Sequence, residues 1–89
     1  MFVAKVVGTV VATRKDENLV GLKLLVIQPL DKKEQPWGQT LVAVDSVGAG
    51  VGETVLVVRG SPARVVLQNA NAPVDAVIVG IVDYMETVD

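Results

Sequence analysis

The chain has 89 residues, of which 51% are hydrophobic, and its 8 basic and 10 acidic residues give it a net charge of −2 at pH 7. Because the basic residues are scattered and 3% of the residues are aromatic, the chain lacks the basic and base-stacking surface that a nucleic-acid-binding protein needs. It contains no cysteine and no histidine, so we expect no disulfide, no metal site and no bound cofactor.

The apolar content is high for so short a chain. A domain of this size buries only about 60–65% of the surface that its unfolded chain exposes, so some apolar side chains must be covered by something else. No stretch of about 20 residues is free of charges and turn residues, so we expect no membrane-spanning helix. The first residues lack the basic region and cleavage site of a secretion signal. We therefore predict a protein of the cytoplasm whose surplus apolar surface is covered by further copies of the chain.

The first predicted strand covers residues 2–13, in which small or apolar residues occupy every even position. Such alternation is typical of a strand with one face toward a core. Gly8 lies in its middle and indicates a bend or a bulge, of the kind that a barrel needs at a corner. Residues 14–21 follow as a polar loop that begins with Arg14 and Lys15.

The second predicted strand covers residues 22–30 and ends at Pro29 and the charged turn behind it. Residues 31–38 then complete a hairpin loop that contains Trp37. An aromatic side chain at this place favours half-burial, as a lid over one end of a barrel.

The third and fourth predicted strands, residues 39–45 and 53–59, enclose residues 46–52, which we call the glycine loop. Three of its last six residues are glycine, in the spacing G-x-G-x-G. A dinucleotide-binding fingerprint has a different spacing and leads into a helix, whereas a strand follows here. The glycines therefore indicate either turn residues with positive φ or close contact with a neighbouring backbone. Ala49 favours the second alternative, since it suggests that nothing bulky fits there.

Asp45 and Glu53 flank the glycine loop and allow two interpretations. They could form a carboxylate pair for acid–base chemistry or for a metal, but no histidine or further acid lies near them in the sequence. We favour a structural role, in which the carboxylates accept hydrogen bonds from backbone N–H groups of the loop. Ser61 could be a nucleophile, but the chain holds no histidine to act as its base.

Ser61 is better explained as the N-cap of a short helix, with Pro62 at the first helical position. Residues 63–68 provide about two helical turns. The fifth predicted strand covers residues 74–82, which are apolar on both faces, and residues 83–89 form an acidic tail.

Five strands with one short helix between the fourth and the fifth predict an all-β fold, a small five-stranded OB-like β-barrel. An OB barrel normally carries its helix between strands three and four, so this chain is a variant of that plan. No internal repeat or linker is visible, and we predict a single domain over residues 1–89. Such a barrel is either an assembling structural protein or an OB-type binding module for nucleic acid or a small ligand.

Three segments carry a resemblance to a known family. They are GTVVATRKDENLVGLKLLVIQPLD (residues 8–31), LVAVDSVGAGVGETVLVVRGSPAR (residues 41–64) and PVDAVIVGIVD (residues 73–83). In this order they resemble the bacterial microcompartment vertex proteins, of the carboxysome and the ethanolamine-utilisation type. The run AVDSVGAGVGE followed by RGSPAR is far more specific than an isolated glycine motif. Pro62 departs from the family, which has a small residue there, but proline is compatible with a first helical turn.

The resemblance implies an OB-like barrel that assembles into a homopentamer. Such pentamers cap the vertices of an icosahedral shell whose facets are hexameric shell proteins, and the shell encloses enzymes in the bacterial cytoplasm. The resemblance therefore implies a structural shell protein without enzymatic activity, with itself and hexameric microcompartment shell proteins as partners, and with neither nucleic acid nor membrane as a partner. The microcompartment is carboxysome-like or a metabolosome.

Two groups of residues are predicted to serve assembly. For the loop at the five-fold axis, where small residues suit the crowding of five copies, we predict Ser46, Val47, Gly48, Ala49, Gly50, Val51 and Gly52. Candidates for the subunit interface are the charged residues Arg14, Lys15, Asp45, Arg59, Arg64 and Asp75.

Overall fold

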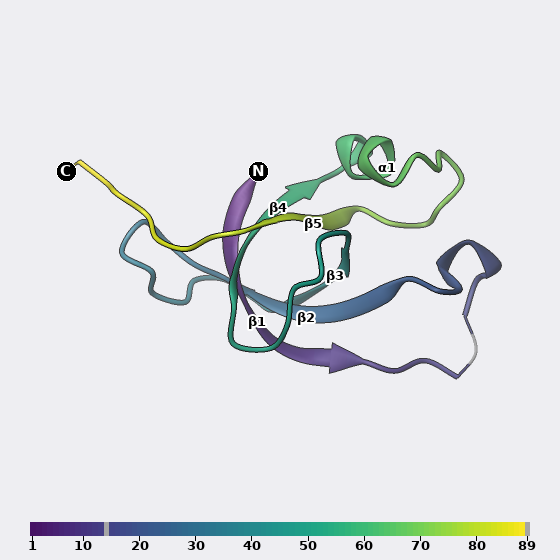
Figure 1. Ribbon diagram of the computed structural model, residues 1–89, viewed down its shortest axis with the longest axis horizontal. Coiled ribbons are helices and arrows are strands. Elements are labelled where there is room, and N and C mark those ends of the chain that lie inside the picture. Colours follow the sequence, from purple (N-terminus) through teal and green to yellow (C-terminus); the bar gives the residue numbers. More distant parts are fainter. Residues whose placement is uncertain (14, 89) are drawn as a thin grey trace.

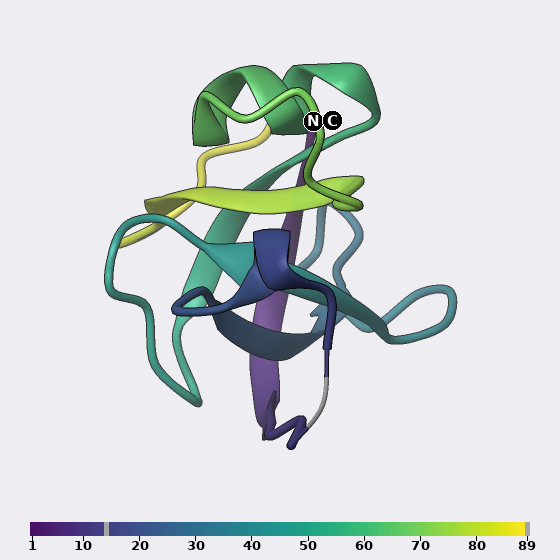
Figure 2. The same cartoon turned by 90° about the vertical axis from the view of Figure 1, so that its right-hand side faces the viewer.

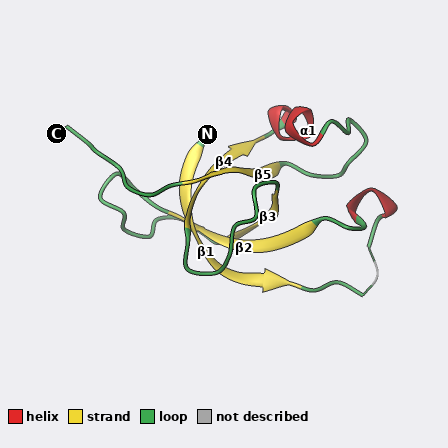
Figure 3. Cartoon of the chain, in the orientation of Figure 1, coloured by secondary structure: helices red, strands yellow, loops and turns green. Residues whose placement is uncertain are grey.

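The computed structural model describes residues 1–13 and 15–88, and within them five strands close into a barrel (Figure 1). The order around the barrel is β1-β2-β3-β5-β4. The elements are β1 (Phe2–Val10), the 3₁₀ helix η1 (Glu17–Leu19), β2 (Lys23–Pro29), β3 (Leu41–Asp45), β4 (Thr54–Arg59), α1 (Ser61–Leu67) and β5 (Ala76–Ile81). Strands β3 and β5 pair in parallel, and the remaining neighbours pair antiparallel. The predicted all-β, five-stranded barrel with a helix between the fourth and fifth strands is confirmed (Figure 3).

The strands are shorter than the sequence predicts, because each ends where its partner ends. Val10 pairs with Leu24, next to the first residue of β2, so β1 stops there instead of at residue 13. Strand β5 starts at Ala76 and not at residue 74, since the carbonyl groups just before it accept from Arg64 and from the N–H of Gly60 instead of a strand.

The bulge predicted at Gly8 is confirmed. Val6 lies opposite Ile27 and Gly8 lies opposite Val26, so the register between β1 and β2 shifts and Val7 has no opposite residue. An extra residue of this kind bends the strand and increases its twist, which is what lets β1 pair with β2 on one edge and β4 on the other.

Two apolar clusters lie on the two sides of the barrel wall. The interior is filled by aliphatic side chains from all five described strands, among them Leu25, Ile27, Val55, Val57 and Ile78, each completely buried. A second cluster lies on the outer face of the wall, where α1 contacts β4 and β5, and contains Val44, Ala63, Ala72, Val74 and Val77. The wall is therefore buried on both faces where the helix covers it, which explains why the fifth strand is apolar at both even and odd positions.

The start of α1 differs from the prediction. The N-cap is Gly60, with φ 75°, and not Ser61, which is the first helical residue and makes no capping hydrogen bond. The chain turns sharply out of β4 at this point while the Gly60 N–H donates to Asp75 O at 2.8 Å. A positive φ favours glycine, so the turn takes the cap position and moves serine into the helix.

Trp37 is also placed differently from the prediction. Its side chain is 65% exposed, so it does not form a half-buried lid. The reason is that the hairpin of residues 31–38 closes on itself and projects from one end of the barrel (Figure 1), with Asp31 N–H donating to Gln35 O and Glu34 N–H donating to Asp31 O.

Neither helix of residues 1–13 and 15–88 has the length and apolar character that crossing a membrane requires.

Candidate assembly site

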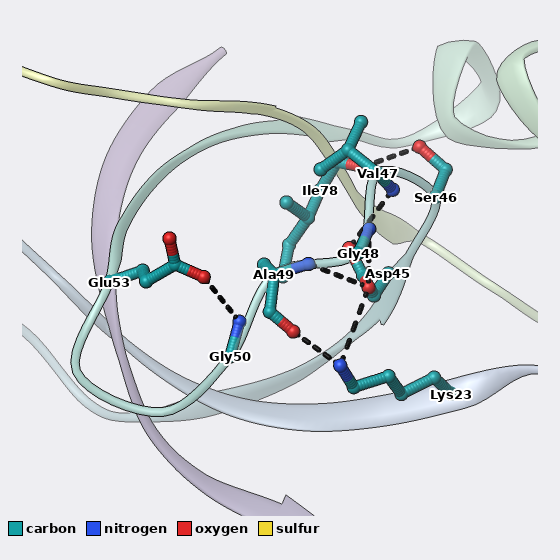
Figure 4. Close-up of polar contacts among 9 residues, drawn as sticks. All are labelled: Lys23, Asp45, Ser46, Val47, Gly48, Ala49, Gly50, Glu53 and Ile78. Carbon is teal, nitrogen blue, oxygen red and sulfur yellow. Dashed lines mark hydrogen bonds and ion pairs between the residues drawn. The ribbon is translucent and has the colours of Figure 1, made fainter.

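The glycine loop joins β3 to β4, and the Asp45 carboxylate holds its first half in place. The carboxylate accepts hydrogen bonds from the backbone N–H groups of Val47 at 3.1 Å, Gly48 at 2.9 Å and Ala49 at 2.9 Å (Figure 4). The Asp45 side chain is only 3% exposed. A carboxylate that accepts from several converging N–H groups is strongly oriented, so the loop has one conformation around it.

Lys23 reaches the same carboxylate from β2. Its Nζ lies 3.8 Å from Asp45 Oδ2, and the ammonium also donates a hydrogen bond to Ala49 O. Half of the lysine side chain remains exposed. The lysine therefore supplies the countercharge for a nearly buried carboxylate and at the same time holds the loop backbone from the other side (Figure 4).

Glu53 holds the second half of the loop. Its Oε1 accepts from the N–H of Gly50 at 2.7 Å, and its own N–H donates to Gly50 O at 3.2 Å. The backbone then joins β1, because Gly52 N–H donates to Val6 O and Val6 N–H donates to Glu53 O. The structural role predicted for the two flanking carboxylates is confirmed.

Ser46 ties the loop to the fifth strand. Its hydroxyl donates to Ile78 O at 2.6 Å and its N–H donates to the same oxygen at 3.3 Å. The loop thus has hydrogen bonds to β1, β2 and β5 as well as to its own flanking residues.

The small residues of the loop serve different purposes. Gly48 and Gly52 have φ of 84° and 94°, a conformation that side chains rarely adopt, so the prediction of positive-φ turn residues is confirmed for these two. Ala49 is completely buried in the core of its own barrel, so its size is set within the subunit. The exposed members are Val47 and Val51, which are 41% and 61% exposed.

Among the charged interface candidates that the structure describes, Asp45 is the one with hydrogen bonds to the glycine loop. Arg59 Nη2 lies 3.9 Å from Asp75 Oδ2, in an ion pair whose side chains are both more than half exposed. Arg64 donates to Val74 O at 3.2 Å and so joins α1 to the segment before β5. Lys15 donates to Ala12 O at 3.1 Å. Arg14 lies outside the described residues.

Two further residues, Lys23 and Gln28, have roles that sequence reasoning missed. Lys23 lies directly opposite Asp45 in the β2–β3 register, so the signal was a cross-strand pair of opposite charges, which is visible only once the register is known. Gln28, whose side-chain amide donates to Gly38 O at 3.2 Å, holds the Trp37 hairpin and had no sequence signal.

The arrangement builds a rigid loop. The Asp45 and Glu53 carboxylates accept from backbone N–H groups, and among residues 1–13 and 15–88 no group of three or more Asp, Glu, His or Cys side chains could hold a metal ion. The loop presents two valine side chains on a backbone that is fixed from three strands, which is a surface suited to contact with another protein.

Comparison with known protein families shows the family of this chain. The sequence model of the family described as "Ethanolamine utilisation protein EutN/carboxysome" matches residues 1–83. The chain belongs to the EutN/CcmL family. The match includes all five described strands, the glycine loop and α1, and it ends two residues after β5.

Relatives within the EutN/CcmL family are named as shell vertex proteins. The bacterial microcompartment shell vertex protein GrpN of Rhodospirillum rubrum is 52% identical over 89 residues, which is 100% of both chains. The carboxysome shell vertex protein CcmL of Synechocystis is 55% identical over 83 residues, which is 93% of this chain and 83% of that protein.

Solved structures of the family agree with the barrel described above. The GrpN pentameric microcompartment shell protein superposes with a TM-score of 0.90 at 52% identity, over 100% of both chains. CcmL of Gloeobacter violaceus superposes with a TM-score of 0.91 at 46% identity, over 98% of this chain and 90% of that chain.

Proposed function

We propose that this chain is a structural shell protein that forms homopentamers and caps the vertices of an icosahedral bacterial microcompartment. The observation that carries the proposal is the similarity over the whole chain to a pentameric microcompartment shell protein, at 52% identity and a TM-score of 0.90. All 89 residues then act as one shell-forming domain.

In this pentamer the glycine loop approaches the five-fold axis. Five copies of one loop fit around an axis only if the backbone is compact and held in one conformation. The hydrogen bonds that the Asp45 and Glu53 carboxylates accept and the one that the Ser46 hydroxyl donates support such a loop. The exposed Val47 and Val51 side chains would then meet their counterparts in neighbouring subunits. A five-fold ring is a head-to-tail assembly that closes, so each subunit uses two different faces.

The function is assembly and not catalysis. The carboxylates that flank the loop are engaged by backbone N–H groups, and the relatives are named as shell vertex proteins. The partners are further copies of the chain at the vertex and hexameric shell proteins at the rim, within a microcompartment shell of the bacterial cytoplasm.

The test begins with the mass of the purified protein in solution, measured by native mass spectrometry. Five chains of 9.4 kDa give about 47 kDa for a closed ring. The second step is coexpression with a hexameric shell protein: closed particles that contain this chain, and open sheets or tubes in its absence, are the expected result. A stable monomer, or shells that close equally well without the chain, would overturn the proposal.

A further inference from the structure

A groove lies between the Trp37 hairpin and the barrel, and we call it the Trp37 groove. It has a volume of about 470 Å³ and is lined by side chains that include Phe2, Trp37, Thr40, Leu41 and Arg59. It therefore combines aromatic and aliphatic walls with one guanidinium. The hairpin that forms its outer side is visible at the left of Figure 1.

The backbone of Trp37 is fixed by hydrogen bonds to β2, although its side chain is exposed. Its N–H donates to Pro29 O at 3.0 Å, and the Gln28 amide donates to the carbonyls of Trp37 and Gly38 at 3.4 and 3.2 Å. The turn beyond it is closed by Asp31, whose carboxylate accepts from the N–H groups of Lys33 and Gln35. A preorganised, exposed tryptophan beside a groove and an arginine is the composition of an interface hot spot.

The described part of the segment after β5 has a complementary composition and is mostly exposed. Among the described residues, those from 83 to 88 form no hydrogen bond or ion pair. Tyr84 is 75% exposed and Val88 is 99% exposed. Asp83 and Glu86 supply negative charge, which complements Arg59, whose side chain is 57% exposed and whose ion pair with Asp75 is long at 3.9 Å. The guanidinium has five N–H donors, so it can bind a second carboxylate.

The Trp37 hairpin and this segment leave the barrel on different sides. Figure 2 shows the hairpin of residues 31–40 on the right of the barrel, while the chain leaves β5 on the left. Both extend toward the same end of the long axis (Figure 1). None of the described residues 83–88 lines the groove of its own subunit, whereas in a head-to-tail ring two different faces of neighbouring subunits meet.

We propose that residues 83–88 of one subunit occupy the Trp37 groove of the next subunit in the ring, and this inference rests on the pentamer proposed above. The reach is sufficient, since six extended residues span about 20 Å and the subunit measures 24 by 22 Å across its two shorter axes. The occupied groove would bury Trp37 and Tyr84 together and bring Glu86 or Asp83 to Arg59.

The chain contains no cysteine, which makes crosslinking a direct test. A chain with Thr40→Cys in the groove and Val88→Cys in the tail is purified as a pentamer and treated with a short bismaleimide, then resolved by denaturing electrophoresis. The expected result is a ladder that extends to five linked chains. The control pairs Val88→Cys with Val65→Cys, which lies on α1, is 75% exposed and is away from the groove. For this pair we expect at least a tenfold lower yield of linked chains.

A second variant tests the role of the tryptophan. Adding Trp37→Ala to the crosslinking chain should reduce the ladder severalfold while the native mass remains that of a pentamer. Two outcomes would overturn the inference: a crosslinked species of monomer mass, which places the tail on its own groove, and an intact pentamer without a ladder, which leaves the groove to another partner. A protein that is monomeric before crosslinking would instead contradict the proposed function, so the two failures are distinguishable.

Discussion

Lys23 and Asp45 face each other across β2 and β3, and through them the barrel wall fixes the glycine loop. The lysine Nζ lies 3.8 Å from Asp45 Oδ2 and also donates to Ala49 O, while the carboxylate accepts from three successive N–H groups of the same loop. The loop is thus held from both its N–H side and its carbonyl side by two residues of the wall. Substitution of either residue should change the conformation of the loop more than that of the barrel.

Removing the Asp45 carboxylate should destabilise the protein. In Asp45→Ala the N–H groups of three loop residues lose their acceptor and the Lys23 ammonium loses its countercharge, which should lower the free energy of unfolding by about 2–3 kcal/mol. Asp45→Asn keeps one oxygen acceptor and should cost less. Urea unfolding at one fixed protein concentration measures both, because assembly makes apparent stability concentration-dependent. Equal stability of wild type and Asp45→Ala would contradict this role of the carboxylate.

The glycines of the loop should differ in their tolerance of a side chain. Gly48→Ala and Gly52→Ala place a Cβ on residues with φ of 84° and 94°, which should cost about 1–2 kcal/mol each. Gly50 is the matched control, since its φ is not positive and an added Cβ would meet only Glu53 Oε1, at 3.6 Å. Thermal unfolding of the three variants should therefore separate Gly50→Ala from the other two. A larger loss in Gly50→Ala would indicate crowding by a neighbouring subunit.

Ala49 should resist enlargement for a reason internal to the subunit. Because the side chain is completely buried in the barrel core, Ala49→Leu should lower stability by about 1–3 kcal/mol through overpacking. Val11→Leu, at a position outside the loop that is 92% exposed, is the control and should leave the free energy of unfolding within about 0.5 kcal/mol of wild type. If Ala49→Leu unfolds like wild type, the core placement of this residue is wrong.

A charge introduced at the exposed tip of the glycine loop should dissociate the pentamer while each subunit remains folded. In Val51→Asp five carboxylates would converge if the loops meet at the five-fold axis, and their repulsion should shift the protein to smaller species that re-form pentamers at high salt. Val11→Asp, at a position that is 92% exposed, carries the same charge change away from the loop and should remain pentameric. Light scattering at low and high salt reads out both. A Val51→Asp pentamer as stable as wild type at low salt would place the loop away from the axis.

The strands, the position of α1 and the Gly8 bulge could be predicted from sequence because they depend on local patterns. The roles of Asp45 and Glu53 were also predictable, since a carboxylate beside a glycine-rich turn has few partners other than nearby N–H groups. Lys23 could not be assigned, because its partner lies across a strand pair and the register is a tertiary property.

Other differences arose where two local signals compete. Ser61 is a good N-cap residue, but the turn out of β4 requires positive φ at Gly60 and takes the cap position. Residues 14–21 were expected to be loop, whereas η1 forms within them because the Asp16 carboxylate accepts from the N–H of Asn18 at 2.8 Å. Trp37 was expected to pack on the barrel. The backbone groups of its hairpin instead form hydrogen bonds with one another, and the hairpin projects from the barrel with the Trp37 side chain exposed.

The seam between β3 and β5 has a consequence for the order in which the protein forms. Val44 and Asp45 pair with Val77 and Ile78, residues more than thirty positions away, and the loop residue Ser46 adds two hydrogen bonds to Ile78 O. Parallel contacts between distant segments form late in folding, since the intervening chain must first be ordered. We therefore expect this seam to form late, and its formation also fixes the start of the glycine loop through Ser46. We expect a chain in which this seam is unformed to lack the finished glycine loop, so that ring formation follows the folding of each subunit.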